Sequence, residues 1–445
     1  MFATSSPADP VVVVGAGPAG ATAALALASA GIAVRLLDRS AFPRNKPCGG
    51  GISARVLKRF PYLVRALPRI AAHRVSRLYL EGPGGRATTI DARGPAALMI
   101  RRVEFDALLV SLAVDAGAEL TTGADIVQVC EDHERVTLTT RKGNQFTASA
   151  VIAADGVNSV VARRLGINKG WPASAVALDM MEETPRALLR DLDPETLWVA
   201  YGYRPEERDG SRGVEALRHA AGDARQRASA EGYAYVFPKR DHVNVGIGYV
   251  LSHFREAIDA APYDVQRRFV ERLRERGVLV GESVREHFTP ALIPIGGPLR
   301  HTGRGRVLLA GDAGGFVNAV TAEGIYYAMV TGELAAHAVR RSTAVSKLAR
   351  IYRRACDHEI GAELRDSVRI QRYLFADGRR IARLVDGAHR ERAAVDLVVD
   401  FVKGSRSYRD LRRRILSRSP YLLLSFVRDC LSTRPLRSQP GVTGL

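Results

Sequence analysis

The segment VVVVGAGPAG, residues 11–20, decides the fold of this chain. Its four valines form an all-apolar run, which is typical of a strand buried in a parallel sheet. The glycines that follow have G-x-G-x-x-G spacing: Gly15 allows a tight turn, Gly17 lets a pyrophosphate approach the backbone, and Gly20 lets a helix pack closely on the sheet. The N-terminus of that helix offers free N–H groups and a positive dipole end to phosphate. The segment therefore predicts a strand–turn–helix unit that binds a dinucleotide.

The next residues complete this unit. ATAALALASAG, residues 21–31, predicts a helix, and IAVRLLD, residues 32–38, predicts a second strand that ends at Asp38. An acid about twenty residues beyond the glycines can accept hydrogen bonds from the ribose hydroxyls of an adenosine. From this unit we expect the cofactor contacts to be Gly15, Ala16, Gly17, Ala19, Gly20, Asp38 and Arg39.

The composition is that of a globular protein with a large core. The chain has 445 residues, of which 46% are hydrophobic and 25% charged, enough for two or three domains. Its four cysteines lack CxxC and His-rich spacing, so we expect no metal site, and their scarcity favours a reducing compartment, the cytoplasm. The apolar N-terminal run is interrupted by glycines and has no basic segment before it, so we expect neither a signal peptide nor a membrane span.

The net charge of +18 comes from 65 Lys and Arg residues against 47 Asp and Glu residues. From Arg340 onward the chain is markedly basic, and apolar residues interleave with the charges, notably in SPYLLLSFVRDCL, residues 419–431. This pattern is typical of a helix in a membrane interface, and equally of a basic helix packed on the protein body. Peripheral contact with the inner face of the membrane is therefore one interpretation. Nucleic acid is not an expected partner because no recognised binding module accompanies the charge, and the sequence does not indicate the oligomeric state.

Two later segments favour FAD over NAD. ADGVNS, residues 154–159, follows an apolar run and places Asp155 at a strand end. GDAGGFVNAVTAEG, residues 311–324, places Asp312 at another strand end, before a long helix. A second acid far down the chain suits a cofactor longer than one adenosine, because Asp312 can accept a hydrogen bond from a ribityl hydroxyl. The N-terminus of the helix can direct its N–H groups to the N1/O2 edge of a flavin, where negative charge appears on reduction.

These segments resemble the FAD-binding core of the p-hydroxybenzoate hydroxylase-type flavoproteins. RRVEFDALL, residues 101–109, also matches the R-x-x-F-D element of that group through Arg102. Without the resemblance, Arg102 would read as an ordinary surface arginine of a helix. The resemblance implies FAD as the cofactor, and it adds to the expected contacts Arg102, Asp155, Asp312, Gly315, Gly324 and Ile325.

Two further motifs resemble the geranylgeranyl reductase family. KPCGGG, residues 46–51, corresponds to a Cys-Gly motif after the second strand, and GYAYVFP, residues 232–238, corresponds to a Y-x-W-x-F-P motif, with Tyr235 in place of the tryptophan. The resemblance covers roughly residues 10–340. It implies a reductase that saturates carbon–carbon double bonds of a geranylgeranyl or other isoprenoid chain with hydride from reduced flavin. The electron donor, NADPH or ferredoxin, stays open, as does the identity of the lipid.

The same motifs define a candidate reaction centre. On a strand, the three aromatic residues of YAYVF would face one side and could wall an isoprenoid pocket, although such a stripe is more often an ordinary core. The bare backbone of the three glycines would let the chain approach the flavin or the substrate, with Cys48 beside them as a proton donor, a gate, a redox-sensitive brake or a small packing residue. Cys48 and Gly49 are also expected to contact the cofactor. The catalytic candidates are Cys48, Tyr233 and Tyr235, and the expected pocket residues are Gly50, Gly51, Tyr233, Tyr235, Phe237 and Pro238.

The predicted fold class is α/β, with a Rossmann-like FAD-binding domain of the p-hydroxybenzoate hydroxylase type, an antiparallel β-sheet substrate domain and a helical C-terminal region. Residues 205–230 are polar and Arg-rich and predict an exposed excursion. The expected boundaries are residues 8–75, 96–168 and 290–340 for a discontinuous FAD-binding domain, 76–95 and 169–289 for the substrate domain, and 341–445 for the basic helical region.

Two other functional classes fit the same residues. One is a flavin-dependent monooxygenase or halogenase on this scaffold, although the Y-x-Y-x-F-P stretch differs from the W-x-W-x-I-P motif of halogenases. The other is a non-catalytic basic flavoprotein.

Overall fold

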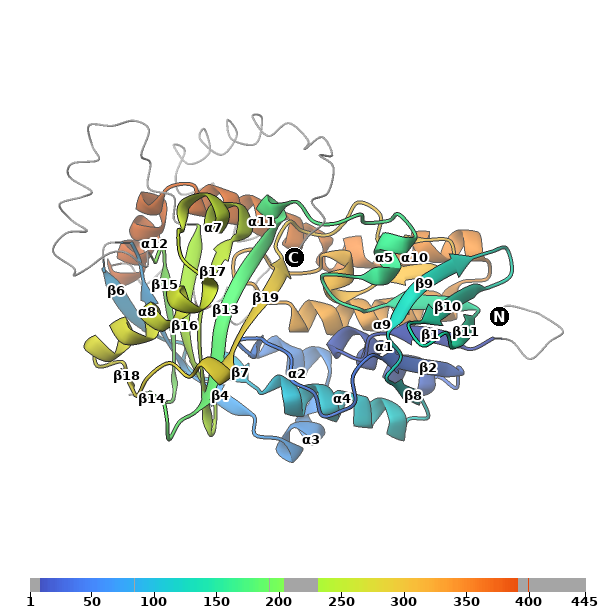
Figure 1. Ribbon diagram of the computed structural model, residues 1–445, viewed down its shortest axis with the longest axis horizontal. Coiled ribbons are helices and arrows are strands. Elements are labelled where there is room, and N and C mark those ends of the chain that lie inside the picture. The colour runs from blue at the N-terminus through green and yellow to red at the C-terminus, as the bar shows by residue number, and fades with distance from the viewer. Residues whose placement is uncertain (1–8, 84, 192, 204–230, 391–398, 400–445) are drawn as a thin grey trace.

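The computed structural model describes residues 9–83, 85–191, 193–203, 231–390 and 399. Within them, two sheets lie at opposite ends of the long axis of the molecule (Figure 1). The excursion expected at residues 205–230 and the apolar, basic segment at residues 419–431 lie outside the described residues. Among the helices that are described, none is both long and apolar enough to cross a membrane.

The six-stranded sheet is the nucleotide-binding part of the fold. Five of its strands are parallel, and β1, β12 and β21 among them are the all-apolar runs that are typical of such a sheet. The edge strand β20 (Gly303–Arg304) pairs antiparallel with β21. The order is β20-β21-β12-β1-β2-β8. The five parallel strands are β1 (Val11–Val14), β2 (Val34–Asp38), β8 (Glu119–Thr122), β12 (Ala150–Ala153) and β21 (Val307–Leu309).

Both faces of this sheet are covered. Three helices pack on one face, where small residues of α1 let α9 approach closely: α1 (Pro18–Ala28), α4 (Arg102–Asp115) and α9 (Ile325–Arg341). The other face packs on the short helix α5 (Val160–Arg164) and a meander of three antiparallel strands: β9 (Ile126–Glu131), β10 (Val136–Thr140) and β11 (Gln145–Ala148). The sheet is therefore buried on both sides, and ligands reach it only at its strand ends.

The seven-stranded sheet has the order β19-β13-β17-β16-β15-β5-β6. All neighbours in it are antiparallel except β15 and β5, which pair in parallel because the chain enters them from separate segments in the same direction. Its strands are β5 (Arg77–Glu81), β6 (Ala87–Asp91), β13 (Val176–Pro185), β15 (Thr196–Tyr201), β16 (Gly232–Pro238), β17 (His242–Val250) and β19 (Phe288–Pro294). Strand-like runs in the sequence at about residues 75–81, 86–91, 176–181, 197–203, 233–237 and 242–250 predict an antiparallel sheet of six of these strands, and β19 is the strand that they miss.

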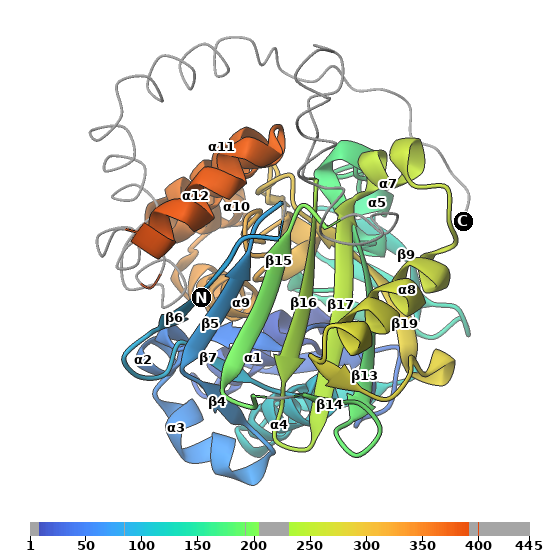
Figure 2. The same cartoon turned by 90° about the vertical axis from the view of Figure 1, so that its left-hand side faces the viewer.

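Helices flank this sheet on its outer side. Figure 2 shows α8 (Pro262–Glu275) across its outer face, where Phe269 packs on Trp198, and α7 (Leu251–Ala257) above it. A two-stranded pair, β14 (Arg190–Asp191) with β18 (Leu279–Val280), lies at the lower end. The opposite face of the sheet is turned toward the nucleotide-binding sheet, so the functional site must lie between them.

A small three-stranded sheet joins the two parts. It consists of β3 (Gly51–Ser53), β7 (Ala97–Met99) and β4 (His73–Val75), with the short helices α2 (Arg55–Arg59) and α3 (Tyr62–Ala66) between its strands. The strand β3 begins at the last glycine of KPCGGG, so this motif lies at the junction of the two sheets.

The C-terminal region is helical as far as it is described. The helices α10 (Val345–Cys356) and α11 (Ala362–Phe375) are joined by a π-helical segment, Asp357–Gly361, and α12 (Gly378–Arg390) follows. α10 packs on α9 through buried residues such as Leu348. α11 packs at one end of the seven-stranded sheet, where Val368 lies with Ala177 of β13 and Val250 of β17, and α12 lies beside the β6 edge (Figure 2).

We propose to keep the division into an FAD-binding domain, a substrate domain and a helical region, with one boundary moved. The expected boundary at residue 290 falls inside β19, which pairs with β13 of the seven-stranded sheet along its whole length. The return to the FAD-binding part therefore comes after Pro294.

Candidate active site

A large cavity lies between the two sheets and receives residues from both. Its volume is about 1900 Å³, larger than the ~300–1,000 Å³ of a typical small-molecule pocket. It extends from the glycine turn after β1, past the loop of residues 46–51, to the inner face of the seven-stranded sheet and helices α11 and α12. A cavity of this size and length can hold two ligands end to end.

The glycine turn shapes one end of the cavity. A Cβ on Gly20 would lie 1.8 Å from the carbonyl oxygen of Gly15, so close helix packing there requires glycine. A Cβ on Gly17 would meet nothing nearer than 3.7 Å, and the nearest atoms belong to the guanidinium groups of Arg44 and Arg102. Gly17 therefore presents bare backbone to a space flanked by positive charge, which suits a pyrophosphate.

Asp38 lies at the end of β2 and lines the same end of the cavity. Its Oδ2 accepts a hydrogen bond from the backbone N–H of Ala16 at 2.8 Å, and its Oδ1 accepts one from the N–H of Ser40 at 2.9 Å. A carboxylate has about four acceptor sites, so Asp38 keeps capacity for the hydroxyls of a ribose. The turn and the acid are thus fixed against each other before a cofactor binds.

Arg102 reaches the cavity from the start of α4. Its guanidinium donates to both carboxylate oxygens of Asp106, at 2.6 and 2.8 Å, and Arg44 lies 3.4 Å from Asp106. Lys46 lines the cavity beside them, and burial followed by the charge of Arg102 lowers its pKa. Three cations therefore share this region with Asp106 and Asp38, an electrostatic setting that favours phosphate groups.

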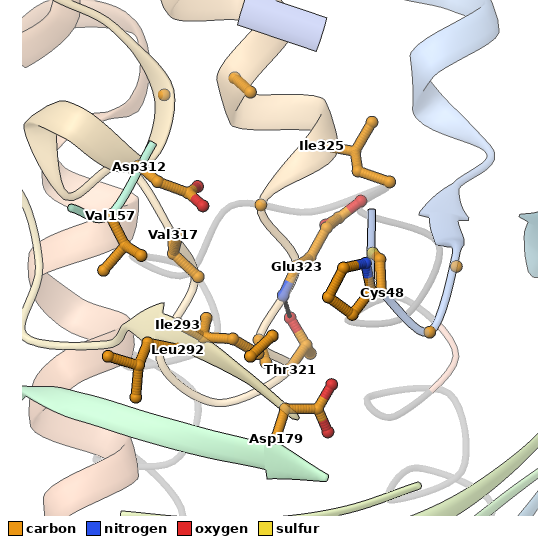
Figure 3. Close-up of a pocket in the computed structure, with 18 of the residues that line it drawn as sticks. Cys48, Val157, Asp179, Leu292, Ile293, Asp312, Val317, Thr321, Glu323 and Ile325 are labelled. Carbon is orange, nitrogen blue, oxygen red and sulfur yellow. Dashed lines mark hydrogen bonds between the residues drawn. The ribbon is translucent and has the colours of Figure 1, made fainter. Parts of the chain in front are cut away.

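Two acids at strand ends face the middle of the cavity. Burial raises the pKa of Asp155, and its Oδ1 is buried without a hydrogen-bond partner among the described residues. Burial also raises the pKa of Asp312, against the charges of Lys46 and Arg102. Asp312 lies beside Gly324 at the start of α9, and the first helical residue, Ile325, also lines the cavity (Figure 3). The first N–H groups of an α-helix have no partner within the helix, so they are available to a ligand at this wall. These acceptors and the helix start fit the hydroxyls and the isoalloxazine edge of FAD, and Asp38, Arg102, Asp312 and Gly324 would hold it.

Four of the expected contacts do not line the cavity. Ala16 is buried in the turn, and Gly20 faces Gly15, so both act through the shape of the turn. Gly315 points toward Gly297 and Trp171, away from the cavity, and Pro238 is buried where β16 pairs with β17. The other expected residues line it: Gly15, Gly17, Ala19, Asp38, Arg39, Cys48, Gly49, Gly50, Gly51, Arg102, Asp155, Tyr233, Tyr235, Phe237, Asp312, Gly324 and Ile325.

The loop of residues 46–51 crosses the middle of the cavity. Gly50 has φ +74°, and a Cβ there would lie 2.1 Å from the carbonyl oxygen of Ile100, so the loop can pass only as glycine. A Cβ on Gly49 would come within 3.0 Å of the ring of Phe237. The glycines thus let the loop lie between the two sheets and against the aromatic residues of β16, with Cys48 at the cavity wall.

A buried ion pair supports the loop from behind. Lys239 follows directly after the aromatic motif, is fully buried, and pairs with Glu183, which also accepts a hydrogen bond from Arg101 at 2.8 Å. Despite its burial, these two cations hold the pKa of Glu183 below its ordinary value. The carboxylate of Glu183 is paired with both Lys239 and Arg101, and none of the three residues lines the cavity. This cluster therefore supports the loop and takes no part in the cavity wall.

The aromatic residues of β16 form one wall. The rings of Tyr233, Tyr235 and Phe237 follow one another, with centroids 5.8 and 4.4 Å apart, and all three line the cavity. The residues between them pack on the opposite side with α8. The prediction that the three rings share one face of the strand is therefore confirmed, whereas their chemical roles remain proposals.

The structure adds Asp179, which sequence reasoning missed. This residue of β13 is only 3% exposed, lines the cavity, and accepts from the hydroxyl of Tyr235. Burial raises its pKa to about 7, although the hydrogen bond from Tyr235 and the charge of Lys46 act in the opposite direction. Figure 3 shows Asp179 among the residues that line the cavity. A single acid inside the otherwise apolar run VALDMM was the signal in the sequence.

A second cluster that the motifs did not reveal lies where α9 begins. Arg55 of α2 lies 2.9 Å from Glu363 of α11 and 3.6 Å from Glu323, and its guanidinium stacks 3.9 Å from the ring centroid of Tyr326. Glu323 in turn accepts from the backbone N–H of Ser53 at 2.8 Å. This cluster fixes the start of α9, the strand β3 after the glycine loop and helix α11 to one another at the cavity wall.

Comparison with known proteins supports FAD as the cofactor. The FAD binding domain family matches residues 9–356. The chain is 31% identical over 335 residues to the menaquinone reductase of Mycobacterium tuberculosis, covering 73% of this chain and 75% of the relative. It is 28% identical over 429 residues to digeranylgeranylglycerophospholipid reductase 2 of Methanopyrus kandleri, covering 93% and 97%. Its fold matches a geranylgeranyl bacteriochlorophyll reductase-like protein of Thermoplasma acidophilum with a TM-score of 0.72 at 20% identity, over 91% and 98% of the two chains.

The fold and the site together define an FAD-dependent oxidoreductase with the p-hydroxybenzoate hydroxylase-type fold. Within that class, the chain belongs to the geranylgeranyl reductase family.

Proposed function

We propose that this protein saturates carbon–carbon double bonds of an isoprenoid chain. FAD, when bound and reduced, supplies the hydride for such a reaction. The observation that carries the proposal is the shape of the cavity, which continues beyond the flavin contacts as an apolar arm between the seven-stranded sheet and the C-terminal helices. The named activities of the relatives support it, because menaquinone and digeranylgeranylglycerophospholipid both carry isoprenoid chains.

The apolar arm suits a long hydrocarbon chain with short methyl branches. One side of it is made by β5 and β15 and the other by α11 and α12, and its lining includes Leu80, Leu197, Val199, Ile370, Leu374 and Ile381. Such a lining offers dispersion contacts and excludes water, which isolated alkene chemistry requires. The aromatic wall of β16 lies where this arm meets the flavin contacts, and its ring faces favour positive charge that develops on a substrate carbon.

The far end of the arm is basic. Arg379, Arg383 and Leu384 of α12 are exposed and line the cavity, so they mark its mouth. An exposed leucine beside exposed arginines is typical of a helix at a lipid surface. We propose that this mouth faces the inner side of a membrane, so that a cytoplasmic protein can collect prenyl lipids there. The donor that reduces the flavin, a nicotinamide or a ferredoxin, is left open.

A single-turnover experiment tests the proposed function. The flavin-loaded protein is reduced chemically without oxygen, and a geranylgeranyl lipid is added in detergent micelles. The expected result is reoxidation of the flavin together with a mass gain of two hydrogens per saturated bond in the lipid. If the lipid mass is unchanged, while oxygen addition gives a hydroxylated product, the protein is a monooxygenase. If the purified protein carries no flavin absorbance, neither activity holds.

A further inference from the structure

We propose that Asp179 donates the proton that completes saturation of the alkene, an inference that rests on the function proposed above. Reduction of a double bond needs a proton as well as a hydride, and the sequence motifs provided only Cys48, Tyr233 and Tyr235 as candidates. The structure places a carboxyl group inside the same wall, where the apolar arm meets the flavin contacts.

The position of Asp179 is set by the strands around it. Side chains alternate along β13, so Asp179 lies on the same face of the sheet as Met181, which packs with Tyr235, whereas Met180 and Glu182 face the other side. The hydroxyl of Tyr235 lies 3.2 Å from Oδ2 and 3.3 Å from Oδ1 of Asp179. No room exists for another side chain beneath this pair, because a Cβ on Gly246 would lie 2.3 Å from the Tyr235 hydroxyl.

The groups around Asp179 favour the acid form at neutral pH. Burial raises the pKa of Asp179 to about 7, and the hydrogen bond from Tyr235 and the charge of Lys46 oppose this rise. Burial raises the pKa of Tyr233 and Tyr235 well above its ordinary value, so both tyrosines are far weaker acids than Asp179. An acid is most useful when its pKa lies near the working pH. Of the groups facing this point, the two tyrosines, Lys46, Cys48 and Asp179, the carboxyl is thus the best matched donor.

The proposed reduction adds one hydride and one proton to the alkene. One alkene carbon receives the hydride, with its two electrons, from reduced FAD, and the other carbon receives the carboxyl proton of Asp179, so the π bond is replaced by two C–H bonds. The FAD is oxidised, the alkene is reduced, and Asp179 is left as a carboxylate that solvent reprotonates. The Tyr235 hydroxyl donates to this carboxylate and stabilises it, so Tyr235 positions and tunes the acid without losing its own proton.

The chain offers a matched control in Glu182. Burial raises the pKa of this buried carboxyl to about 7 as well, yet it lies on the opposite face of β13, where it accepts from the hydroxyl of Ser283 at 2.7 Å. A neutral variant at Glu182 removes a carboxyl of similar burial and pKa from the same strand without touching the cavity.

The experiment uses flavin-loaded wild type, Asp179→Asn, Tyr235→Phe and Glu182→Gln. Two quantities are measured between pH 5 and 9: the single-turnover rate of flavin reoxidation by geranylgeranyl lipid, and the carboxyl C=O absorbance by infrared difference spectroscopy without substrate. For wild type we expect the rate to fall as the pH rises through about 7, because the carboxyl then loses its proton. Asp179→Asn should slow the rate by about 10²–10⁴-fold, the usual contribution of general acid catalysis, and remove one titrating carboxyl band.

The other variants separate a chemical role from a structural one. Tyr235→Phe removes a hydrogen bond that lowers the pKa of Asp179, so the alkaline limb of the rate profile and the carboxyl band should both move to higher pH. Glu182→Gln should remove a different band and leave the rate profile in place. The proposal is overturned if Asp179→Asn keeps the wild-type rate and profile, or if no carboxyl band near neutral pH depends on Asp179. If wild type never reduces the lipid but the carboxyl band near neutral pH depends on Asp179, the proposed function is wrong, although Asp179 is a buried acid that titrates near neutral pH.

Discussion

The side-chain amide of Asn244 donates a hydrogen bond to the carbonyl oxygen of Cys48 at 3.1 Å, which fastens the loop of residues 46–51 to β17 of the seven-stranded sheet. Asn244 is fully buried and also contacts the sulfur of Met181 at 3.6 Å. The loop that approaches the flavin contacts is therefore held by the substrate sheet, and movement of one sheet relative to the other would move Cys48.

Replacing this amide should loosen the loop. We expect Asn244→Ala to lower the free energy of unfolding by about 1–3 kcal/mol, because a buried carbonyl loses its partner, and to speed amide hydrogen exchange in residues 44–51. The matched control is Gln266→Ala, which breaks a buried bond from Nε2 to the carbonyl oxygen of Val245 at 2.9 Å on the outer side of the same strand. Equal exchange in the loop for both variants would contradict this role of Asn244.

The two glycines of the nucleotide turn should respond differently to a methyl group. Gly17→Ala is expected to fold, since its Cβ would meet no protein atom within 3.7 Å, but to lose FAD affinity by at least about tenfold because the methyl occupies the space beside Arg44 and Arg102. Gly20→Ala is expected to unfold the domain, because its Cβ would lie 1.8 Å from the oxygen of Gly15. Flavin absorbance and far-ultraviolet circular dichroism of each variant measure the two effects. Normal flavin content in Gly17→Ala would argue against a pyrophosphate at this turn.

Cys48 should act as a gate and not as the proton source. Its sulfur accepts from the N–H of Gly50 at 3.4 Å and faces the cavity. We expect Cys48→Ser to keep its flavin and the position of its alkaline rate limb, with a loss in rate below about tenfold, since general acid catalysis would require 10²-fold or more. Alkylation with a maleimide should inactivate wild type and the exposed-site control Cys130→Ser, but spare Cys48→Ser. A larger loss of rate together with a shifted pH profile would indicate that Cys48 is the proton donor.

Sequence reasoning located most of the cofactor end because local chemistry determines it. The turn from Gly15 to Gly20 and the acids Asp38 and Asp312 are specified by short segments with one structural solution each, so their elements could be placed within a few residues. The aromatic alternation on β16 was equally local.

What sequence reasoning missed depends on contacts between distant segments. Asp179 and Tyr235 are 56 residues apart, and Arg55 meets Glu363 across 308 residues, so neither pair forms a motif. β19 was missed because its TPALIP run contains two prolines, which argue against a strand in sequence but are tolerated at the sheet edge where β19 lies. The parallel pairing of β5 with β15 likewise follows only from the path of the chain between the two sheets.

The two buried acids of β13 should make stability depend on pH in an unusual direction. The pKa of Asp179 and of Glu182 is raised to about 7 in the folded protein, so the folded state binds more protons than the unfolded state between about pH 4 and pH 7. The free energy of unfolding should therefore decrease as the pH rises through this window, where each unit of difference in pKa corresponds to about 1.4 kcal/mol. Urea unfolding of the flavin-loaded protein at a series of pH values measures this slope. Asp179→Asn and Glu182→Gln should each reduce the change of the free energy of unfolding with pH. If the double variant shows the same pH dependence as wild type, these two carboxyl groups are not its source.

The basic mouth of the cavity should bind an anionic membrane, from which the substrate would enter. Arg379 and Arg383 are exposed on α12 beside Leu384, and Arg379 is partly neutralised by Asp377 at 2.9 Å. Near an anionic bilayer each basic residue contributes about 1 kcal/mol, so Arg379→Ser with Arg383→Ser should weaken binding to vesicles containing anionic phospholipid by roughly fivefold to thirtyfold.

The control for the mouth removes the same charge elsewhere. Arg267→Ser with Arg268→Ser acts on exposed residues of α8, on the outer face of the seven-stranded sheet, where Arg267 is paired with Glu271. Sedimentation with vesicles compares the two double variants at low salt and at about 0.5 M salt, which screens surface charges. If the mouth faces the membrane, only the α12 variant should lose vesicle binding, and its turnover of lipid in vesicles should fall while turnover of lipid in neutral detergent micelles is kept. Equal losses of vesicle binding in both variants would show that net charge alone attracts the protein to the membrane. The lipid would then enter the cavity without contact between its mouth and the membrane.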